Sequence, residues 1–281
     1  MNLQDELTNL AGRIGSFHEA PAISYSQWHE FAANTVVALT AGGESSRYAA
    51  ALDGKDVNKN AHELPNGDSM IEITIRMYRD AGIKKFVALV FHNAHSVQDR
   101  VGDGSKLGVE IVYSEDPEQA TGTGGAVRNA IDNGSIPSNC NLVVANPCDI
   151  FFDRQADFVK KICEAHIEGS NKSMLATAVL TPGIPIPATG MLVKENKVVD
   201  AHKFPIVPVP SHVGISVFSP KLYPRFQDLF DLSKKTDFEA LLFPLLAKEG
   251  KLWSVKLPPS RWIQVKDLKG YKELIEKLEE N

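Results

Sequence analysis

The chain has 281 residues and a mass of 30.8 kDa, and its 43% hydrophobic and 23% charged residues are typical of a globular protein and exclude a disordered or fibrous one. With 30 basic and 35 acidic residues the net charge is −5, which argues against a nucleic-acid partner, because duplex-binding proteins carry a basic face. The chain has three cysteines without a C-x-x-C pair, no apolar run of about 20 residues and an acidic N-terminus. These features predict a cytoplasmic protein with no membrane partner.

Residues 1–33 are predicted to form a helical extension that precedes the main domain. Five apolar side chains repeat at helical spacing and would share one face: Leu3, Leu7, Leu10, Ile14 and Phe17. The simpler interpretation is a helix that packs on the main domain. The alternative is a contact with a second copy of the chain, which would make the protein a homo-oligomer.

Strands and helices alternate along residues 34–281, which we expect to form one domain. Strands are expected at 34–40, 85–91, 109–113, 141–145 and 213–218, and helices at 70–80, 126–131, 238–248 and 268–280. This alternation predicts an α/β fold with a mostly parallel sheet and helices on both faces. The prolines of 181–210 predict an irregular arm or an excursion at the sheet edge, and Pro244 is expected to kink or end its helix.

The first candidate site is the loop that follows the first strand. Gly42 and Gly43 would let backbone N–H groups converge on an anion, and Arg47 would supply a planar, charged fork for phosphate oxygens. The loop matches neither the Walker motif nor G-x-G-x-x-G. A glycine pair at this place can also be only a tight strand-to-helix turn.

Taken together, seven short blocks resemble the sugar-1-phosphate nucleotidyltransferases, the pyrophosphorylases that make nucleotide sugars. In chain order they are 42–47 (GGESSR), 64–72 (LPNGDSMIE), 103–115 (DGSKLGVEIVYSE), 122–126 (GTGGA), 146–150 (NPCDI), 213–218 (VGISVF) and 262–265 (WIQV). The resemblance implies a Rossmann-like nucleotidyltransferase fold. It also implies a Mg²⁺-dependent enzyme that transfers a nucleoside monophosphate from an NTP to a sugar-1-phosphate, which releases pyrophosphate and forms an NDP-sugar.

The resemblance also assigns roles to individual residues. It implies a nucleotide site made of Ala41, Gly42, Gly43, Gly122 and Thr123. Its catalytic residues would be Arg47 and a lysine, for which Lys59 fits the spacing better than Lys55. Its metal ligands would be Asp149 and Gln264, and Gly190 and Lys203 would contact the sugar phosphate.

Some of these positions depart from the family pattern. Gln264 stands where the family has a metal-binding aspartate, Ser45 where it has a glycine, and His202 where it has an acidic residue. These departures leave open an alternative, a catalytically impaired regulatory protein that binds a nucleotide sugar. A second alternative is a cytidylyltransferase that acts on a phospho-alcohol such as phosphocholine.

Overall fold

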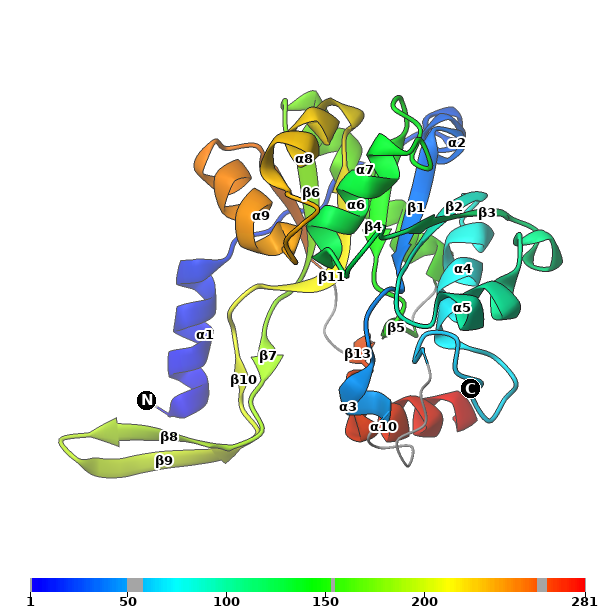
Figure 1. Cartoon of the computed structure of the whole chain (residues 1–281). Helices are drawn as coiled ribbons and strands as arrows, with labels where there is room; N and C mark the ends of the chain where they lie inside the picture. The colour runs from blue at the N-terminus through cyan, green and yellow to red at the C-terminus, as the bar shows by residue number, and fades with distance from the viewer. Residues whose placement is uncertain (1, 50–57, 153–154, 257–261, 281) are drawn as a thin grey trace.

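The computed structural model describes residues 2–49, 58–152, 155–256 and 262–280 (Figure 1). Lys55, the alternative to Lys59, lies outside these residues. No helix in the described ranges combines the length and the hydrophobicity that a membrane span requires.

The central sheet of the described chain has seven strands in the order β12-β6-β11-β4-β1-β2-β3. Their bounds are β1 (Thr35–Thr40), β2 (Lys85–Val90), β3 (Glu110–Glu115), β4 (Asn141–Ala145), β6 (Ala176–Thr181), β11 (Ser211–Phe218) and β12 (Leu252–Lys256). β11 runs antiparallel to β4 and β6, and the other neighbouring pairs run parallel. The predicted mixed, mostly parallel sheet is confirmed.

Helices cover both faces of this sheet, as predicted. One face carries α2 (Tyr25–Ala33), α4 (Met70–Asp80), α5 (Ala94–Val101) and α7 (Gln155–Asn171), and the other carries α6 (Gly122–Asp132), α8 (Tyr223–Leu229) and α9 (Phe238–Lys248). The strand β1 shows why two cores form, because successive side chains point to opposite faces. Val37 and Leu39 join the first core, whereas Val36 and Ala38 join the second.

A smaller lobe lies beyond the sheet, around a short antiparallel pair (Figure 1). β5 (Asp149–Phe151) pairs with β13 (Trp262–Gln264), so that Gln264 lies directly opposite Asp149. α3 (Ser46–Ala49) and α10 (Leu268–Glu279) pack around this pair. The lobe has a core of its own: Tyr48, Leu64, Met70, Cys148, Ile150, Ile263, Val265 and Leu274.

The proline-rich segment is more regular than expected. β7 (Ile184–Pro185) pairs with β10 (Ile206–Val207), and beyond them β8 (Thr189–Lys194) pairs with β9 (Lys197–Lys203) in a ribbon that projects from the molecule (Figure 1). Residues 189–203 contain no proline, so nothing in them blocks strand pairing. Glu195 and Asn196 both take positive φ angles, of 49° and 65°, which suits the two-residue turn of a hairpin.

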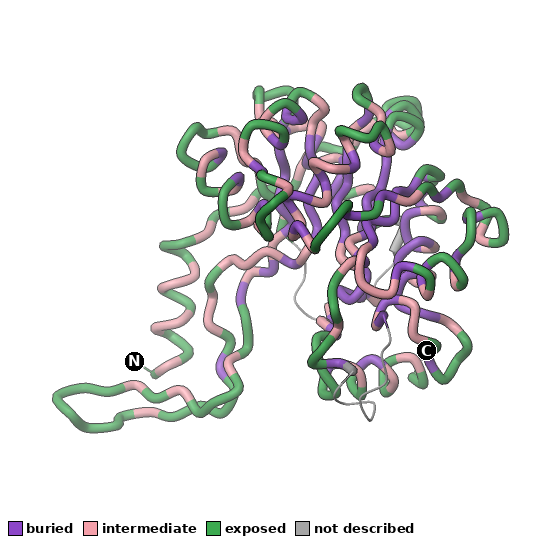
Figure 2. Tube along the Cα trace, viewed as in Figure 1, coloured by how far each residue is buried: buried purple, intermediate pink, exposed green. Residues whose placement is uncertain are grey.

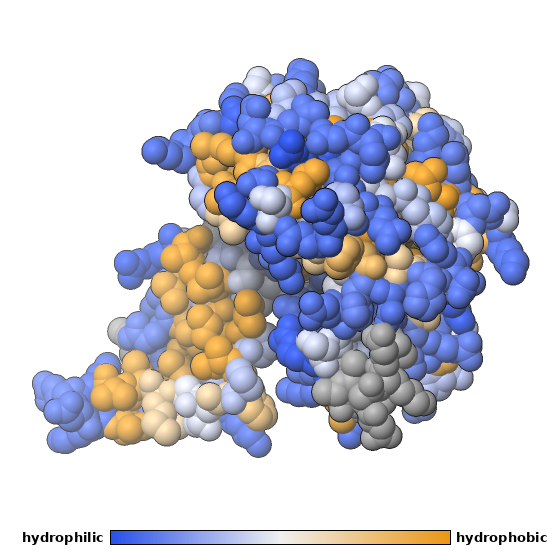
Figure 3. Space-filling view, viewed as in Figure 1, coloured by the Kyte–Doolittle hydropathy of each residue, from blue (hydrophilic) through white to orange (hydrophobic). Residues whose placement is uncertain are grey.

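Helix α1 (Leu3–Ile14) leans on this ribbon rather than on the sheet. The N–H of Leu3 donates to Asp200 Oδ2 at 2.7 Å, and no α1 residue is buried (Figure 2). Apolar side chains gather on the surface of α1 and the ribbon in Figure 3. Among those more than 40% exposed on this unit are Ile14, Met191, Val193, Val198, Val199 and Phe204. A homo-oligomer formed through the N-terminal helix stays a prediction.

One helix differs from expectation. α6 begins at Gly122, four residues earlier than predicted, because packing rather than helix propensity decides its first turn: a Cβ on Gly124 would lie 2.2 Å from the Phe230 ring. α9 has its predicted bounds and does not end at Pro244, and its side chains Phe238, Leu242 and Leu246 are buried.

We expect the buried, neutral His166 to make a contribution to stability that is lost in mild acid. This side chain is 2% exposed in α7, and burial lowers its pKa to about 4. In the unfolded chain the pKa is about 6.5, so between these values the unfolded state binds a proton that the folded state does not. Stability therefore falls as the pH drops through this window, by up to about 3 kcal/mol.

Urea unfolding at pH 7 and pH 4.5 would measure this effect. The variant His166→Gln removes the titrating ring, whereas Asp149, whose raised pKa acts in the opposite direction, is present in both proteins. The free energy of unfolding of the wild type should therefore fall relative to that of the variant between pH 7 and pH 4.5. Equal changes in both proteins would contradict the assignment.

Candidate active site

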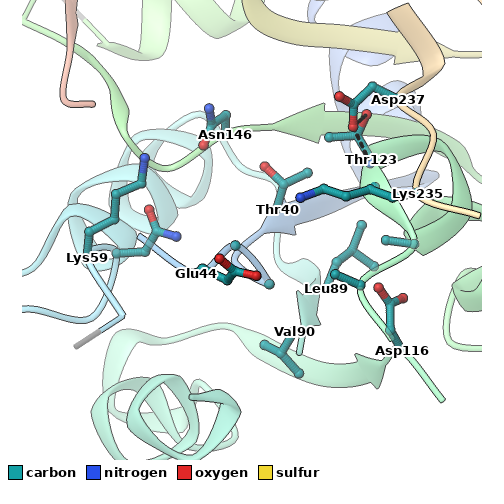
Figure 4. A pocket seen from close by; sticks show the side chains of 16 residues that line it. Thr40, Glu44, Lys59, Leu89, Val90, Asp116, Thr123, Asn146, Lys235 and Asp237 are labelled. Atoms are coloured by element: carbon teal, nitrogen blue, oxygen red, sulfur yellow. Dashed lines mark hydrogen bonds between the residues drawn. The ribbon is translucent and has the colours of Figure 1, made fainter. Parts of the chain in front are cut away.

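A pocket of about 220 Å³ opens at the carboxyl ends of four parallel strands (Figure 4). Thr40 ends β1, Leu89 and Val90 end β2, Asp116 follows β3 and Asn146 follows β4. Ligands of open α/β sheets bind at this edge. The other lining residues are Gly42, Gly43, Glu44, Lys59, Asn60, Ala120, Gly122, Thr123, Ala126, Lys235 and Asp237.

The glycine pair forms part of the pocket wall. A Cβ on Gly42 would lie 3.1 Å from the backbone nitrogen of Phe91, so a glycine is needed for the loop to pass close to the end of β2. Ala41 is buried beneath the loop, where its N–H donates to Leu89 O at 2.8 Å and its carbonyl accepts from Asn58 Nδ2 at 2.7 Å. The loop is therefore fixed to the sheet.

Ser45 takes the conformation for which a glycine would be the usual residue. Its φ is 56°, which costs a non-glycine residue on the order of 1 kcal/mol. Its Oγ accepts a hydrogen bond from the backbone N–H of Lys59 at 3.2 Å, which links the glycine loop to the lysine. Arg47, on α3, is exposed and is not one of the described residues that line the pocket.

Lys59 joins the pocket to the small lobe. Its Nζ donates to Cys148 Sγ at 3.1 Å and to the carbonyl of Val265 at 3.4 Å. Both acceptors are uncharged in this setting, because burial raises the pKa of the Cys148 thiol. Lys59 therefore lines the pocket with a positive charge, which also acts on the nearby Asp149 carboxylate.

Asp149 lies next to Cys148 and is 3% exposed. Its Oδ1 accepts from Trp262 Nε1 at 2.9 Å and from Gln264 Nε2 at 3.1 Å. Its Oδ2 is buried and has no hydrogen-bond partner within the described part of the chain. Burial raises the pKa of Asp149 to about 6, and the two hydrogen bonds oppose this shift.

A partnerless carboxylate oxygen is the kind of ligand that Mg²⁺ takes in proteins, usually together with phosphate oxygens and water. The chemistry of this oxygen therefore fits a metal, although neither Asp149 nor Gln264 belongs to the described lining of the pocket. Across residues 2–49, 58–152, 155–256 and 262–280, no group of three or more His, Cys, Asp or Glu side chains could hold a metal alone. Gln264 turns its amide nitrogen, not its carbonyl oxygen, to Asp149.

Gly122 and Thr123, the first residues of α6, line the opposite wall of the pocket. Asp237 holds this end of the helix, since its Oδ1 accepts from the N–H of Thr123 at 2.9 Å and from its hydroxyl at 3.3 Å (Figure 4). A Cβ on Gly122 would lie 2.7 Å from Thr236 O, so no other residue fits there without a shift of the backbone.

The two residues expected at the sugar phosphate lie on the β8–β9 ribbon. Gly190 pairs with His202 and Lys203 pairs with Thr189, and neither residue belongs to the described lining of the pocket. A Cβ on Gly190 would lie 2.6 Å from Pro205 and 3.2 Å from Leu3, so this glycine serves the packing of α1 on the ribbon. The Nζ of Lys203 lies 4.9 Å from the centre of the Phe204 ring.

Among the pocket residues that the sequence did not predict are three charged ones outside the seven blocks: Asp116, Lys235 and Asp237. The position of Asp116 after a predicted strand is a usable signal, because strand ends form the binding edge of such sheets. Lys235 and Asp237 lie in a connecting segment more than 100 residues further on, and no local pattern marks them.

Comparisons with known proteins agree with this geometry. A family model described as nucleotidyl transferase matches residues 40–278. A crystal structure from Bacillus anthracis, of a protein to which glucose-1-phosphate thymidylyltransferase activity is attributed, in complex with sucrose, is 18% identical. It aligns with a TM-score of 0.63 over 86% of this chain and 94% of its own, which supports the Rossmann-like fold. No curated protein matches the chain by sequence.

Proposed function

The chain belongs to the nucleotidyl transferase family, and from this membership we propose that it transfers the nucleoside monophosphate of an NTP to a sugar-1-phosphate. In this reaction a phosphate oxygen of the sugar-1-phosphate attacks the α-phosphorus of the NTP. The bond to the β-phosphate oxygen breaks, pyrophosphate leaves in line, and an NDP-sugar forms. We propose residues 34–281 as the transferase domain and 1–33 as its extension, although Phe31 and Ala32 pack into the main core.

The observation that carries the proposal is the placement of Lys59 beside the glycine pair at the binding edge of the sheet. Two anions must meet in this reaction, so a cation and backbone dipoles have to offset their repulsion and hold them in line. Lys59 supplies the cation, and Gly42 and Gly43 supply backbone N–H groups. No side-chain nucleophile is needed for phosphoryl chemistry of this kind.

Other roles follow from the same proposal. Gly122 and Thr123 would contact the nucleoside, and Arg47 would reach the leaving pyrophosphate. Asp149 would hold Mg²⁺ through Oδ2, with Gln264 beside it. The ion would neutralise charge on the phosphates. The contact of Gly190 and Lys203 with the sugar phosphate stays a prediction.

A second candidate is a regulatory protein that binds a nucleotide sugar without turning it over. The hydrogen bond from Gln264 to Asp149 favours it, since an amide group donates where a second carboxylate would add a negative charge for the metal. An enzyme and a regulatory protein would share the pocket and differ in turnover.

Pyrophosphate release, measured with Mg²⁺ over a grid of NTPs and acceptors, tests the proposal. The acceptors would be several sugar-1-phosphates and phosphocholine. We expect one productive pair with a sugar-1-phosphate; a productive pair with phosphocholine would instead identify a phospho-alcohol enzyme. If no pair releases pyrophosphate but the protein still binds an NDP-sugar, the result would favour the regulatory candidate.

In the productive pair, Asp149→Asn is expected to lower the rate at least 100-fold, since the amide weakens the hold on the metal. The matched control is Asp80→Asn, which removes an exposed carboxylate of α4 and should leave the rate unchanged. Equal rates for wild type and Asp149→Asn would contradict the metal assignment.

A further inference from the structure

We propose that Asp116 reads the nucleotide base and that the site selects guanine, so that GTP is the preferred donor. This inference rests on the proposed nucleotidyl transfer and deepens it, since it names the donor. It depends on a buried carboxylate in the pocket to which the transfer reaction gives no task.

The pocket has two chemically different ends. Figure 4 shows Lys59 and Asn146 on one side and Asp116 and Leu89 on the other. The end near Lys59 suits phosphates because it combines a cation with the glycine pair, which Glu44 follows. Asp116 lines the other end together with Leu89 and Lys235, and its carboxylate would repel phosphate oxygens. A base, with apolar faces and a polar edge, suits that end.

The side chain of Asp116 is fixed in one orientation. It is 8% exposed, and its Oδ2 accepts a hydrogen bond from the backbone N–H of Thr121 at 2.8 Å. Thr121 comes directly before α6, so the carboxylate is anchored to the wall that carries Gly122. Burial raises the pKa of Asp116, and hydrogen bonds from the backbone and the side chain of Thr121 oppose the rise. Because Asp116 lines the pocket, its carboxylate can also accept hydrogen bonds from a ligand there.

A carboxylate can only accept hydrogen bonds, and this separates the bases. The Watson–Crick edge of guanine offers two adjacent donors, N1–H and the N2 amino group. Uracil and thymine offer one donor, N3–H, between two carbonyl oxygens that a carboxylate repels. Adenine and cytosine offer one amino group beside a ring nitrogen that is itself an acceptor. Among these bases, only guanine can donate two hydrogen bonds from its Watson–Crick edge to one carboxylate.

Equilibrium binding of GTP, ATP, CTP, UTP and dTTP to the full chain with Mg²⁺ tests the inference. We expect GTP to bind roughly 10- to 100-fold more tightly than UTP or dTTP, the range that hydrogen bonds to a charged group support. A tighter fit for UTP or dTTP would overturn the inference and leave nucleotide binding intact. Absence of binding by every NTP would overturn the proposed function itself.

The variant Asp116→Asn provides a second, independent readout. Its oxygen must face Thr121 to accept the N–H, so its amino group faces the pocket and turns an acceptor into a donor. We expect the preference for GTP over UTP to be lost or reversed. The control is Glu115→Gln, which changes the exposed neighbouring carboxylate and should keep the wild-type ratio. An unchanged ratio in Asp116→Asn, with an unchanged melting temperature, would overturn the inference.

Discussion

Replacing Lys59 by methionine is expected to lower the rate of nucleotidyl transfer roughly 100- to 1,000-fold, the loss typical when one preorganised donor to a developing charge is removed. Methionine keeps most of the length of the side chain and removes the charge. The acceptors of Nζ, the Cys148 thiol and the Val265 carbonyl, bring no negative charge to the site. These two contacts do not neutralise the charge of Lys59, although the nearby Asp149 carboxylate offsets part of it. The variant would remove that charge from the phosphates.

The other lysine of the pocket offers a matched control. Lys235 lies across the pocket from Lys59, near Asp237 and Thr123 (Figure 4). Lys235→Met should cost less than about tenfold, since we place the nucleoside rather than the phosphates on that side. The measurements are kcat and KM for pyrophosphate release, with thermal unfolding as a check on folding. A larger loss in Lys235→Met than in Lys59→Met would mean that the phosphates lie at the other end.

Gly214→Ala is expected to destabilise the protein by about 3 kcal/mol and to inactivate it. Gly214 has a φ of 75°, and an added Cβ would lie 2.4 Å from Asp149 Oδ2. The methyl group would therefore meet a buried carboxylate that Trp262 and Gln264 hold in place. Either the backbone of β11 shifts or Asp149 moves away from its hydrogen-bond donors.

The control Gly134→Ala separates the two causes of this loss of stability, which are the strain of a positive φ and the clash of the added Cβ. Gly134 has a similar φ of 78°, but a Cβ there would meet nothing within 4 Å. This control should cost on the order of 1 kcal/mol, the strain of the backbone alone. Urea unfolding gives both values, and pyrophosphate release should stay normal in Gly134→Ala. Equal destabilisation in the two variants would show that Asp149 and its surroundings yield to the methyl group.

The parts of the fold that the sequence predicts well are those that local patterns decide. α4 begins and ends where expected, because Ser69 caps its first turn and Ala81-Gly82 stop it. β4 and α9 also have their predicted bounds. The start of α6 was wrong because Phe230, about 100 residues away, requires glycines in its first turn. The sequence did not predict the pairing of β8 with β9, because the prolines that flank these strands indicate irregular structure.

The sequence likewise predicts the part of the candidate site that comes from residues close together in the chain. Gly42, Gly43 and Lys59 come from one strand-to-loop segment, and the structure brings them together at the pocket. Asp116 and Asp237 line the same pocket but come from segments far apart in the chain. No local sequence pattern predicts that these two segments lie close together. The family resemblance predicted Gly190 and Lys203 at the sugar phosphate, and the structure places both on the β8–β9 ribbon.

The pairing of β13 with β5 has a consequence for how the site could be switched off. Trp262 and Gln264 reach Asp149 from more than 100 residues away, through a pair of three-residue strands in the small lobe. Local opening of β13 and α10 would separate these donors from Asp149 and leave the seven-stranded sheet intact. The free energy that protects the proposed metal site would therefore be that of one short strand pair and one helix. It would be smaller than the free energy that protects the fold.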